Sequence, residues 1–204
     1  MSAFYVVMVV IIMLAVLSSD YYVRRQRKLL INKLINLLIN KKFTEFYNLL
    51  GSRRVKRLIP LFNLRLLEFN AAVLQQKTEK AKEVLDSLQN KKMSGRQTIE
   101  FYGRALNYFI EKRDATYAKT CYTKIDKVNG YQKEKSYLVT LYKIMMLDET
   151  DDEEKIENRL ISDDSQEKVT DYYLLAHINE IKKDFKRAKK YNQLADKIIT
   201  EIVE

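Results

Sequence analysis

The chain contains few of the residues that interrupt helices or build reactive sites. Its 204 residues include four glycines, one proline, one cysteine, one histidine and no tryptophan. Sheets and long loops normally use glycine and proline where the backbone reverses, so their scarcity predicts long helices joined by short turns. Cys121 is the only cysteine, which excludes a disulfide within the chain and favours a reducing compartment.

The same scarcity argues against catalysis. His177 is the only histidine, so Ser-His-Asp, Cys-His and multi-histidine metal sites would lack a base or most of their ligands. The four glycines are isolated, which excludes a glycine-rich phosphate loop. The acidic run from Asp148 to Glu154 lacks the alternating spacing of a calcium loop, and we interpret it as a solvated loop before a helix N-terminus. We expect no enzyme activity, no cofactor and no metal.

An apolar segment stands at the N-terminus. The run Ala3–Leu17 contains no polar residue except Tyr5, and with the residues around it the segment has about 19 to 21 residues, just enough for a helix to cross the roughly 30 Å hydrocarbon core. A secretory signal peptide would carry positive charge before the run and a small-residue cleavage site after it, and neither is found here. A buried helix of a soluble protein is the other alternative, but such helices rarely stay apolar for so long.

The residues after the run indicate its orientation. Tyr21 and Tyr22 are typical of the aromatic belt at a membrane interface, and Arg24 and Arg25 follow at once, as expected on the cytoplasmic side. We therefore predict that residues 1–22 are a single-pass signal-anchor helix with its N-terminus outside, and that residues 23–204 form one cytoplasmic domain. No glycine or proline linker follows the anchor, so we expect it to continue as one helix into that domain.

The positive charge of the chain is concentrated beside this anchor. The segment from Arg24 to Arg57 contains eleven lysines and arginines and one acid, Glu45, so it accounts for the whole net charge of +10. Two groups stand out in it: Arg24, Arg25, Arg27 and Lys28, then Arg53, Arg54, Lys56 and Arg57. Such a cluster can contact anionic lipid, bind nucleic acid through its phosphates, or only orient the anchor. Its place next to the anchor favours anionic lipid headgroups.

The rest of the chain shows a repeated pattern. Apolar residues recur at helical spacing, and five short segments combine a polar turn with the start of a second helix. These segments are Lys42–Phe46, Lys77–Ala81, Asp114–Ala118, Asp152–Ile156 and Asp184–Ala188. Their last residues are separated by 35, 37, 38 and 32 positions.

This pattern resembles the tetratricopeptide repeat, a helix–turn–helix unit of about 34 residues. The third unit carries the resemblance best, with Tyr102, Ala105, Leu106 and Phe109 on its first helix and Ala118, Tyr122 and Ile125 on its second. The fifth unit follows with Tyr172, Leu175, Ala176, Ala188 and Ala195, and the second with Ala81, Leu85 and Leu88. Phe46 and Ile156 replace the small residue in the first and fourth units, and the characteristic proline that ends each unit is absent.

The resemblance implies an α-solenoid of about five hairpins. Together with the apolar N-terminal segment, it predicts an all-α fold in which a transmembrane helix is followed by this solenoid. It also implies a concave groove lined by the first helices, which in this family binds peptides. The candidate groove residues are Asn63, Asn70, Asn107, Tyr173 and His177, and ordinary polar surface is the alternative interpretation of all five. Cys121 falls on the second helix of the third unit, where a small buried side chain is favoured over a reactive thiol.

Together these features predict a membrane-anchored adaptor or scaffold that displays a helical repeat domain at the cytoplasmic face of a membrane. Its expected partners are one or more proteins and a membrane with anionic lipid headgroups, with no nucleic acid and no small-molecule substrate. The alternative is an obligate structural subunit of a larger membrane complex. A third hypothesis, a nucleic-acid tether, would give binding that weakens steeply with salt.

The predicted orientation can be tested by labelling intact cells. With Cys121 replaced by alanine, Ser2→Cys should react with an impermeant thiol reagent added from outside. Glu204→Cys should react only after the cells are lysed, because the domain is expected to lie in the cytoplasm. The reverse labelling pattern would contradict the orientation and move the domain to the other side of the membrane.

Overall fold

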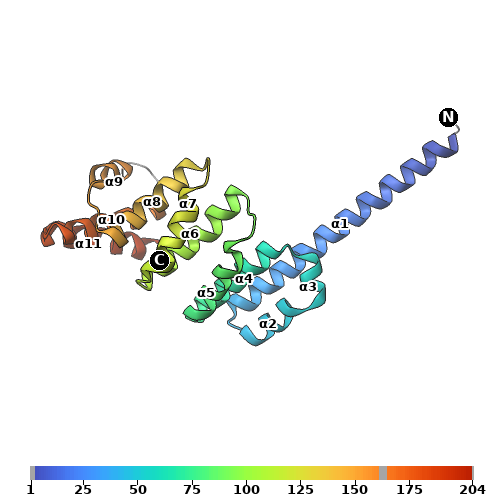
Figure 1. The fold of residues 1–204 in the computed structure, drawn as a ribbon, viewed down its shortest axis with the longest axis horizontal. Coiled ribbons are helices and arrows are strands. Elements are labelled where there is room, and N and C mark those ends of the chain that lie inside the picture. Colours follow the sequence, from blue (N-terminus) through green and yellow to red (C-terminus); the bar gives the residue numbers. More distant parts are fainter. Residues whose placement is uncertain (1–2, 161–164, 204) are drawn as a thin grey trace. The chain divides into compact units, whose positions relative to one another are not determined.

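The computed structural model describes residues 3–160 and 165–203, and within these ranges every regular element is an α-helix (Figure 1). The side chains of residues 3–12, 14–17, 165–167 and 202–203 lie outside this description. The helices are α1 (Ala3–Ile39), α2 (Phe43–Gly51), α3 (Arg53–Leu58), α4 (Leu61–Leu74), α5 (Thr78–Gln89), α6 (Gly95–Glu111), α7 (Ala115–Asp126), α8 (Gln132–Leu147), α9 (Glu153–Arg159), α10 (Ser165–Ile181) and α11 (Phe185–Val203). The predicted all-α class is therefore confirmed for the described residues.

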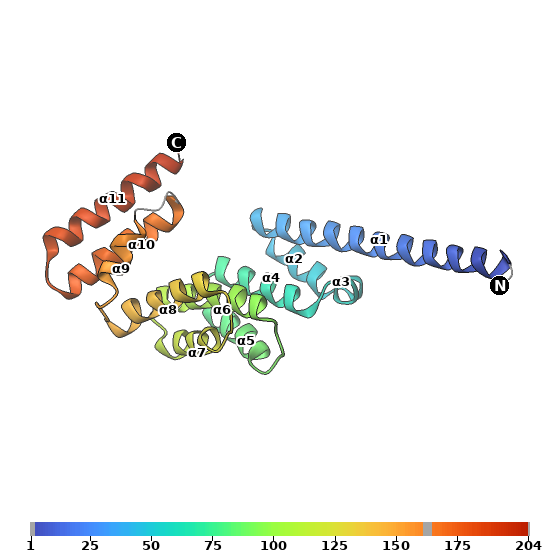
Figure 2. The same cartoon turned by 90° about the horizontal axis from the view of Figure 1, so that it is seen from above.

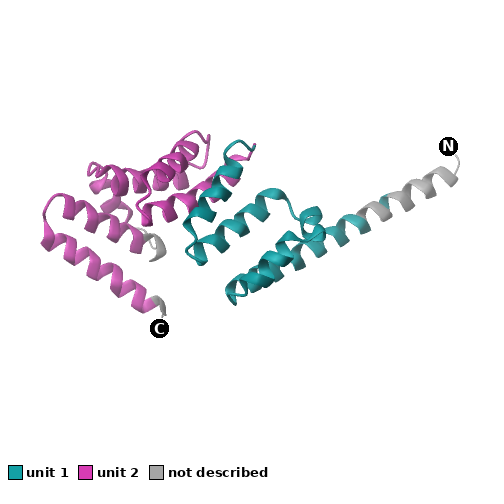
Figure 3. Ribbon diagram, turned by 60° about the horizontal axis from the view of Figure 1, so that its bottom comes forward, with its two compact units in different colours: residues 1–91 teal, residues 92–204 magenta. Residues whose placement is uncertain are grey.

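Packing divides the chain into two compact units, which Figure 3 colours separately. Unit 1 is Met1–Lys91 and contains α1 to α5, and unit 2 is Lys92–Glu204 and contains α6 to α11. The boundary predicted after residue 22 rests on the hydrophobicity of the N-terminal segment, whereas the two units are defined by contacts between residues. The division into two units does not test that boundary, which stays a prediction.

Helix α1 is continuous from the apolar run, past the first basic group, to Ile39. The expected absence of a break between the two segments is confirmed. In its C-terminal part Leu30, Leu34 and Leu38 recur every four residues and are buried in the core of unit 1, where α2, α3 and α4 cover them. Leu29, in contrast, is 54% exposed, so the buried stripe is narrower than the run of leucines suggests.

Within the described residues, no helix is both long and apolar enough to cross a membrane. The apolar run Ala3–Leu17 contributes its backbone to α1, but its side chains, apart from that of Met13, lie outside the description. Met1 and Ser2 lie outside it entirely. The transmembrane anchor therefore stays a prediction.

Four hairpins turn through the same backbone geometry. A residue with left-handed backbone stands two positions before the second helix in each, and these residues are Lys41, Gln76, Arg113 and Lys183, with φ between 53° and 62°. The N–H of each donates to the carbonyl three residues earlier, and the next N–H donates to the carbonyl five residues before its own, all at 2.8–3.0 Å. Glycine is usual at this position of the motif, since a Cβ costs about 1–2 kcal/mol there. In this chain Lys, Gln or Arg takes the place of glycine at all four turns, so each turn carries this backbone strain.

The fourth residue of the second helix is buried in all five hairpins. Phe46, Ala81, Ala118, Ile156 and Ala188 are each the fourth residue of their helix and are at most 3% exposed. The backbone N–H of each donates to the carbonyl of the residue just before the helix. The second helices thus begin where the sequence predicts, and the bulky Phe46 and Ile156 occupy the same buried position as the three alanines.

The fourth hairpin, α8 and α9, turns differently. Asp148 also has left-handed backbone, with φ 54°, but four residues, rather than one, separate it from α9. The N–H of Glu149 donates to the carbonyl of Lys143. Residues 148–152 form the loop predicted from the acidic run. The prediction is wrong for Glu153, whose side chain is 15% exposed and makes ion pairs within unit 2.

Unit 2 is built on close contacts between successive hairpins. Its first helix, α6, begins with a capping box in which the Ser94 hydroxyl accepts from the Gln97 N–H while the Gln97 side chain accepts from the Ser94 N–H. A Cβ added to Gly103 of α6 would lie 3.0 Å from Leu138 of α8, so glycine allows these two helices to approach. Helices α10 and α11 lie side by side at the far end of the unit (Figure 2).

The buried fourth residue generates a stability prediction. Ala118 is fully buried in α7, which packs along α6, so Ala118→Leu should lower the free energy of unfolding by about 1–3 kcal/mol through overpacking. Lys119→Leu is the matched control, because Lys119 is exposed on the same helix. Urea unfolding followed by circular dichroism measures both. Equal stabilities for the two variants would contradict the assigned packing of α7.

Candidate functional site

The two basic groups predicted from the sequence meet in unit 1. The first group lies on α1 and the second on α3, a six-residue helix that follows α2. Figures 1 and 2 both show α3 beside α1. We call the combined set the α1–α3 basic surface: Arg24, Arg25, Arg27, Lys28, Arg53, Arg54, Lys56 and Arg57. All are exposed except Arg27, which is half-buried.

Local sequence explains why α3 forms. The Ser52 hydroxyl accepts a hydrogen bond from the Val55 N–H and so caps the first turn. Val55 is the residue that α3 buries completely, and Ile59 directly after the helix is 2% exposed. With its apolar residues turned into the core, the four basic residues of α3 are left on the outside.

Two side-chain hydrogen bonds join α3 to α1. The Arg27 Nε donates to the backbone carbonyl of Leu58 at 2.8 Å, at the end of α3 where helix carbonyls lack partners. The Arg54 Nη2 donates to the Gln26 Oε1 at 2.7 Å. These contacts connect residues 28 and 31 positions apart in the sequence. No local pattern in the sequence indicates them.

The surface has little compensating negative charge. Arg24 pairs with Asp20 at 2.8 Å, one helical turn earlier. For the seven other basic residues, no carboxylate among the described residues lies within ion-pair distance. The positive charges of this surface are therefore available to an external anion.

A second candidate is a groove in unit 2. It has a volume of about 710 Å³ and lies among α6, α8, α9 and α10. Ile99 and Gly103 of α6 and Tyr137 and Leu138 of α8 give it an apolar side. The remaining lining residues are mostly charged or polar: Glu100, Arg104, Lys133, Glu134, Ser136, Lys155, Arg159, Thr170 and Asp171. An apolar side with a mixed-charge border can accommodate a peptide segment.

An ion pair between α9 and α10 lines the groove. Arg159 of α9 donates to Asp171 of α10 through two nitrogens, Nη2 to Oδ1 at 2.6 Å and Nε to Oδ2 at 3.1 Å. Asp171 is 2% exposed, so this paired geometry compensates a carboxylate that has lost its water. The guanidinium of Arg159 also lies 5.9 Å from the centre of the Tyr137 ring. The pair joins α9 to α10 at the wall of the groove.

The residues predicted for a partner groove lie elsewhere. Asn63 and Asn70 are half-buried in α4 of unit 1. In unit 2, Asn107 donates its amide to the Gly103 carbonyl of its own helix at 3.0 Å, and Tyr173 donates to Asp196 of α11 at 3.0 Å. The His177 Nε2 lies 3.7 Å from the Asp148 Oδ1, and its Nδ1 lies 3.8 Å from the Glu180 Oε2. None of these five lines the 710 Å³ groove, and their contact with a partner stays a prediction.

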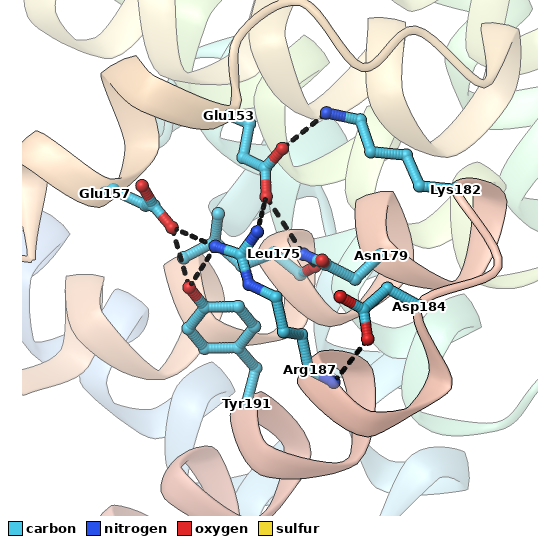
Figure 4. A network of polar contacts seen from close by, with 8 residues as sticks. All are labelled: Glu153, Glu157, Leu175, Asn179, Lys182, Asp184, Arg187 and Tyr191. Atoms are coloured by element: carbon cyan, nitrogen blue, oxygen red, sulfur yellow. Dashed lines mark hydrogen bonds and ion pairs between the residues drawn. The ribbon is translucent and has the colours of Figure 1, made fainter.

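A polar network holds α9 in place, and sequence reasoning missed it (Figure 4). Glu153 of α9 accepts hydrogen bonds from Lys182 and, at 3.1 Å, from the Asn179 amide. It also forms an ion pair with Arg187, whose Nη1 lies 3.3 Å from the Glu153 Oε1. Asn179 is 1% exposed, so the carboxylate satisfies a buried amide.

A second carboxylate of α9 completes the network. Glu157 accepts from the Arg187 Nη2 and from the Tyr191 hydroxyl, both at 2.7 Å. A seven-residue helix is too short to be stable alone, so α9 depends on this network, on buried Ile156 and on the Arg159–Asp171 pair. Since α9 contributes Lys155 and Arg159 to the groove, the network also fixes one wall of the groove.

The expectation for Cys121 is confirmed, since its side chain is fully buried in α7. Burial, with the nearby charge of Asp114, raises the pKa of its thiol well above the usual range, which disfavours the reactive thiolate. In the part of the chain that the structure describes, no group of three or more histidine, cysteine or acidic side chains is placed to hold a metal ion.

Comparisons with known proteins give no match for this chain, whether with protein-family models, with curated proteins or with solved structures.

The α9 network predicts a pH-dependent loss of stability. Burial would raise the pKa of Glu153, but hydrogen bonds from Lys182 and Asn179 and the charges of Lys182 and Arg187 outweigh it and lower the pKa. A carboxyl with a lowered folded-state pKa stabilises the fold above its unfolded pKa of about 4.3, and this contribution disappears as the pH falls through the folded value. Glu153→Gln should therefore cost about 1–2 kcal/mol near neutral pH and almost nothing in strong acid.

The control for this prediction is the neighbouring Glu154→Gln, because Glu154 is exposed. Urea unfolding of both variants and of the unmodified chain, at a series of pH values from neutral to acidic, measures the difference. A Glu153→Gln variant as stable as the Glu154→Gln variant at neutral pH would show that the network does not hold α9.

Proposed function

We propose that the chain is a membrane-anchored scaffold that presents a helical repeat domain to protein partners at the cytoplasmic face of a membrane. The observation that carries this proposal is the continuity of α1. One helix contains the apolar run Ala3–Leu17 and, without a break, the leucines that build the core of unit 1. A continuous helix would keep unit 1 close to the bilayer without a flexible linker, which suits a scaffold.

The resemblance to the tetratricopeptide repeat supports the same proposal. Four hairpins share one turn geometry, and all five bury the fourth residue of their second helix. The groove of unit 2 includes residues from α6, α8 and α10, the first helices of three successive hairpins. In repeat proteins of this kind the first helices line the binding surface. We infer that a partner segment binds in this groove, its apolar side chains against Ile99 and Tyr137.

An obligate structural subunit remains the second candidate, and one observation favours it. Several large apolar side chains are exposed in both units, including Leu61 at 51%, Leu74 at 57% and Phe185 at 68%. Permanent burial of such residues against neighbouring subunits would remove them from water. This candidate predicts contacts through these side chains rather than through the groove.

Site-specific photo-crosslinking in the native membrane distinguishes the two candidates. A photoreactive amino acid is introduced at Ile99 in the groove, at Phe185 among the exposed apolar residues, or at Lys189, an exposed control position on α11. The scaffold proposal expects adducts with a second protein from Ile99 and none from Lys189. Adducts from Phe185 without any from Ile99 would instead support the obligate subunit.

A further inference from the structure

We propose that the α1–α3 basic surface is a single binding surface for anionic lipid headgroups, with α3 positioned by α1 to reach the bilayer. This inference rests on the proposed membrane anchor and adds the ligand class and the residues that bind it. The sequence places the two basic groups about 30 residues apart, and the structure brings them together.

The surface acts as one unit because α3 is fixed to α1 by contacts at both of its ends. Near its start, Arg54 bonds to Gln26, and at its end the carbonyl of Leu58 accepts from Arg27. Between them, Val55 is completely buried. The helix therefore cannot turn its basic residues away from α1 without breaking these contacts and exposing Val55.

The chemistry of the surface fits phosphate and carboxylate headgroups. Six of its eight residues are arginines, whose planar guanidinium groups bind phosphate oxygens through two parallel hydrogen bonds. Only Arg24 has a carboxylate partner among the described residues. Arg53, Lys56 and Arg57 follow each other at three- and four-residue spacing, which places them on one face of α3.

The height of the surface above the apolar run decides whether it can act on a membrane. Gln26 and Arg27 stand nine and ten residues after Leu17 in the same helix, about 14–15 Å along its axis at about 1.5 Å per residue. The headgroup layer extends about 5–8 Å beyond the hydrocarbon, and charges act over a Debye length of about 8 Å at physiological salt. The sum matches the height of the surface even for an upright helix, and a tilted helix brings α3 closer.

The same position distinguishes lipid from nucleic acid as the ligand. Both present phosphates, and the cations alone do not separate them. The α1 part of the basic surface, however, begins seven residues after the apolar run and belongs to the same helix. Lipid headgroups of the membrane that holds the anchor would therefore lie next to the surface without any movement of the chain. This position favours lipid over nucleic acid.

The test uses the full chain carrying a fluorophore beside α3. Gly51 is suited to this because it is exposed and a Cβ there meets no atom within 4 Å. The chain with Gly51→Cys, labelled with a fluorophore, is reconstituted into vesicles of phosphatidylcholine alone or mixed with phosphatidylserine. Both vesicles contain a trace of lipid with a quencher on its headgroup. Quenching should be at least about fivefold stronger in the phosphatidylserine vesicles and should weaken as salt is raised.

Charge-reversal variants identify the surface responsible. The variant that reverses α3 carries Arg53→Glu, Arg54→Glu, Lys56→Glu and Arg57→Glu, and it should lose the difference between the two vesicles. The matched control makes the same change of charge on exposed lysines of unit 2: Lys119→Glu, Lys186→Glu, Lys189→Glu and Lys190→Glu. It should keep the difference. Circular dichroism checks that each variant remains helical.

A third variant tests whether the two groups act as one surface. Arg25→Glu and Lys28→Glu change only α1 and leave Gln26, Arg27 and all of α3 intact. Because the two groups are joined, this pair should also lower the quenching of the label beside α3, by about half. An unchanged signal would overturn the single surface.

The remaining outcomes separate the lipid inference from the proposed anchor. Equal quenching in the two vesicles, with the chain still embedded in both, would overturn headgroup binding and leave the anchor standing. Binding to phosphatidylserine vesicles alone, and none to neutral ones, would support headgroup binding and contradict the anchor. If duplex RNA added at equal charge abolishes the quenching while phosphatidylserine vesicles do not compete for the RNA, nucleic acid becomes the ligand and the inference is overturned.

Discussion

A single backbone constraint organises the hairpins, namely the left-handed residue that ends the first helix of four of them. The same two hydrogen bonds surround it in each hairpin, and the second helix starts two residues later in each case. The fourth residue of that helix then points into the core in all five hairpins, whether it is an alanine or a larger residue such as Phe46. Because the turns carry Lys, Gln or Arg rather than glycine, the packing beyond them has to compensate the strain.

The hairpin of α8 and α9 shows what replaces that constraint when the turn is longer. Its short second helix is held by ion pairs of three side chains. Glu153 pairs with Lys182, directly after α10, and Glu157 pairs with Arg187 of α11. Arg159 pairs with Asp171 of α10. Polar contacts thus add to the burial of Ile156 in positioning α9, whose helix is too short to be held by apolar packing alone. Helix α9 also lines the groove of unit 2 through Lys155 and Arg159. The position of this side of the groove therefore depends on charged groups, and protonation of Glu153 or Glu157 would weaken it.

The sequence predicted the features that depend on neighbouring residues. Helical periodicity with few glycines and prolines was enough for the fold class, and polar turns followed by Ala118 or Ala188 located the second helices. The features it did not predict arise between residues far apart in the chain. Gln26 and Arg27 give no local sign that α3 will dock on them, and Glu153 is indistinguishable in sequence from the exposed Glu154 beside it. The groove of unit 2 was missed for the same reason, because Gly103 acquires its role only when Leu138 of another helix packs against it.

The unbroken α1 has a geometric consequence for everything attached to it. An α-helix turns by about 100° and rises by about 1.5 Å with each residue. The number of residues between the two ends of α1 therefore sets both their distance and the angle between the directions in which their side chains point. A single residue inserted between Leu17 and Arg24 would rotate α2, α3 and α4, which cover the C-terminal part of α1, about a quarter of the way round the helix axis relative to the apolar run. Seven inserted residues would return them to within about 20° of the original direction, only further along the axis. The direction in which α3 faces relative to the apolar run therefore depends on helical phase and not on length alone.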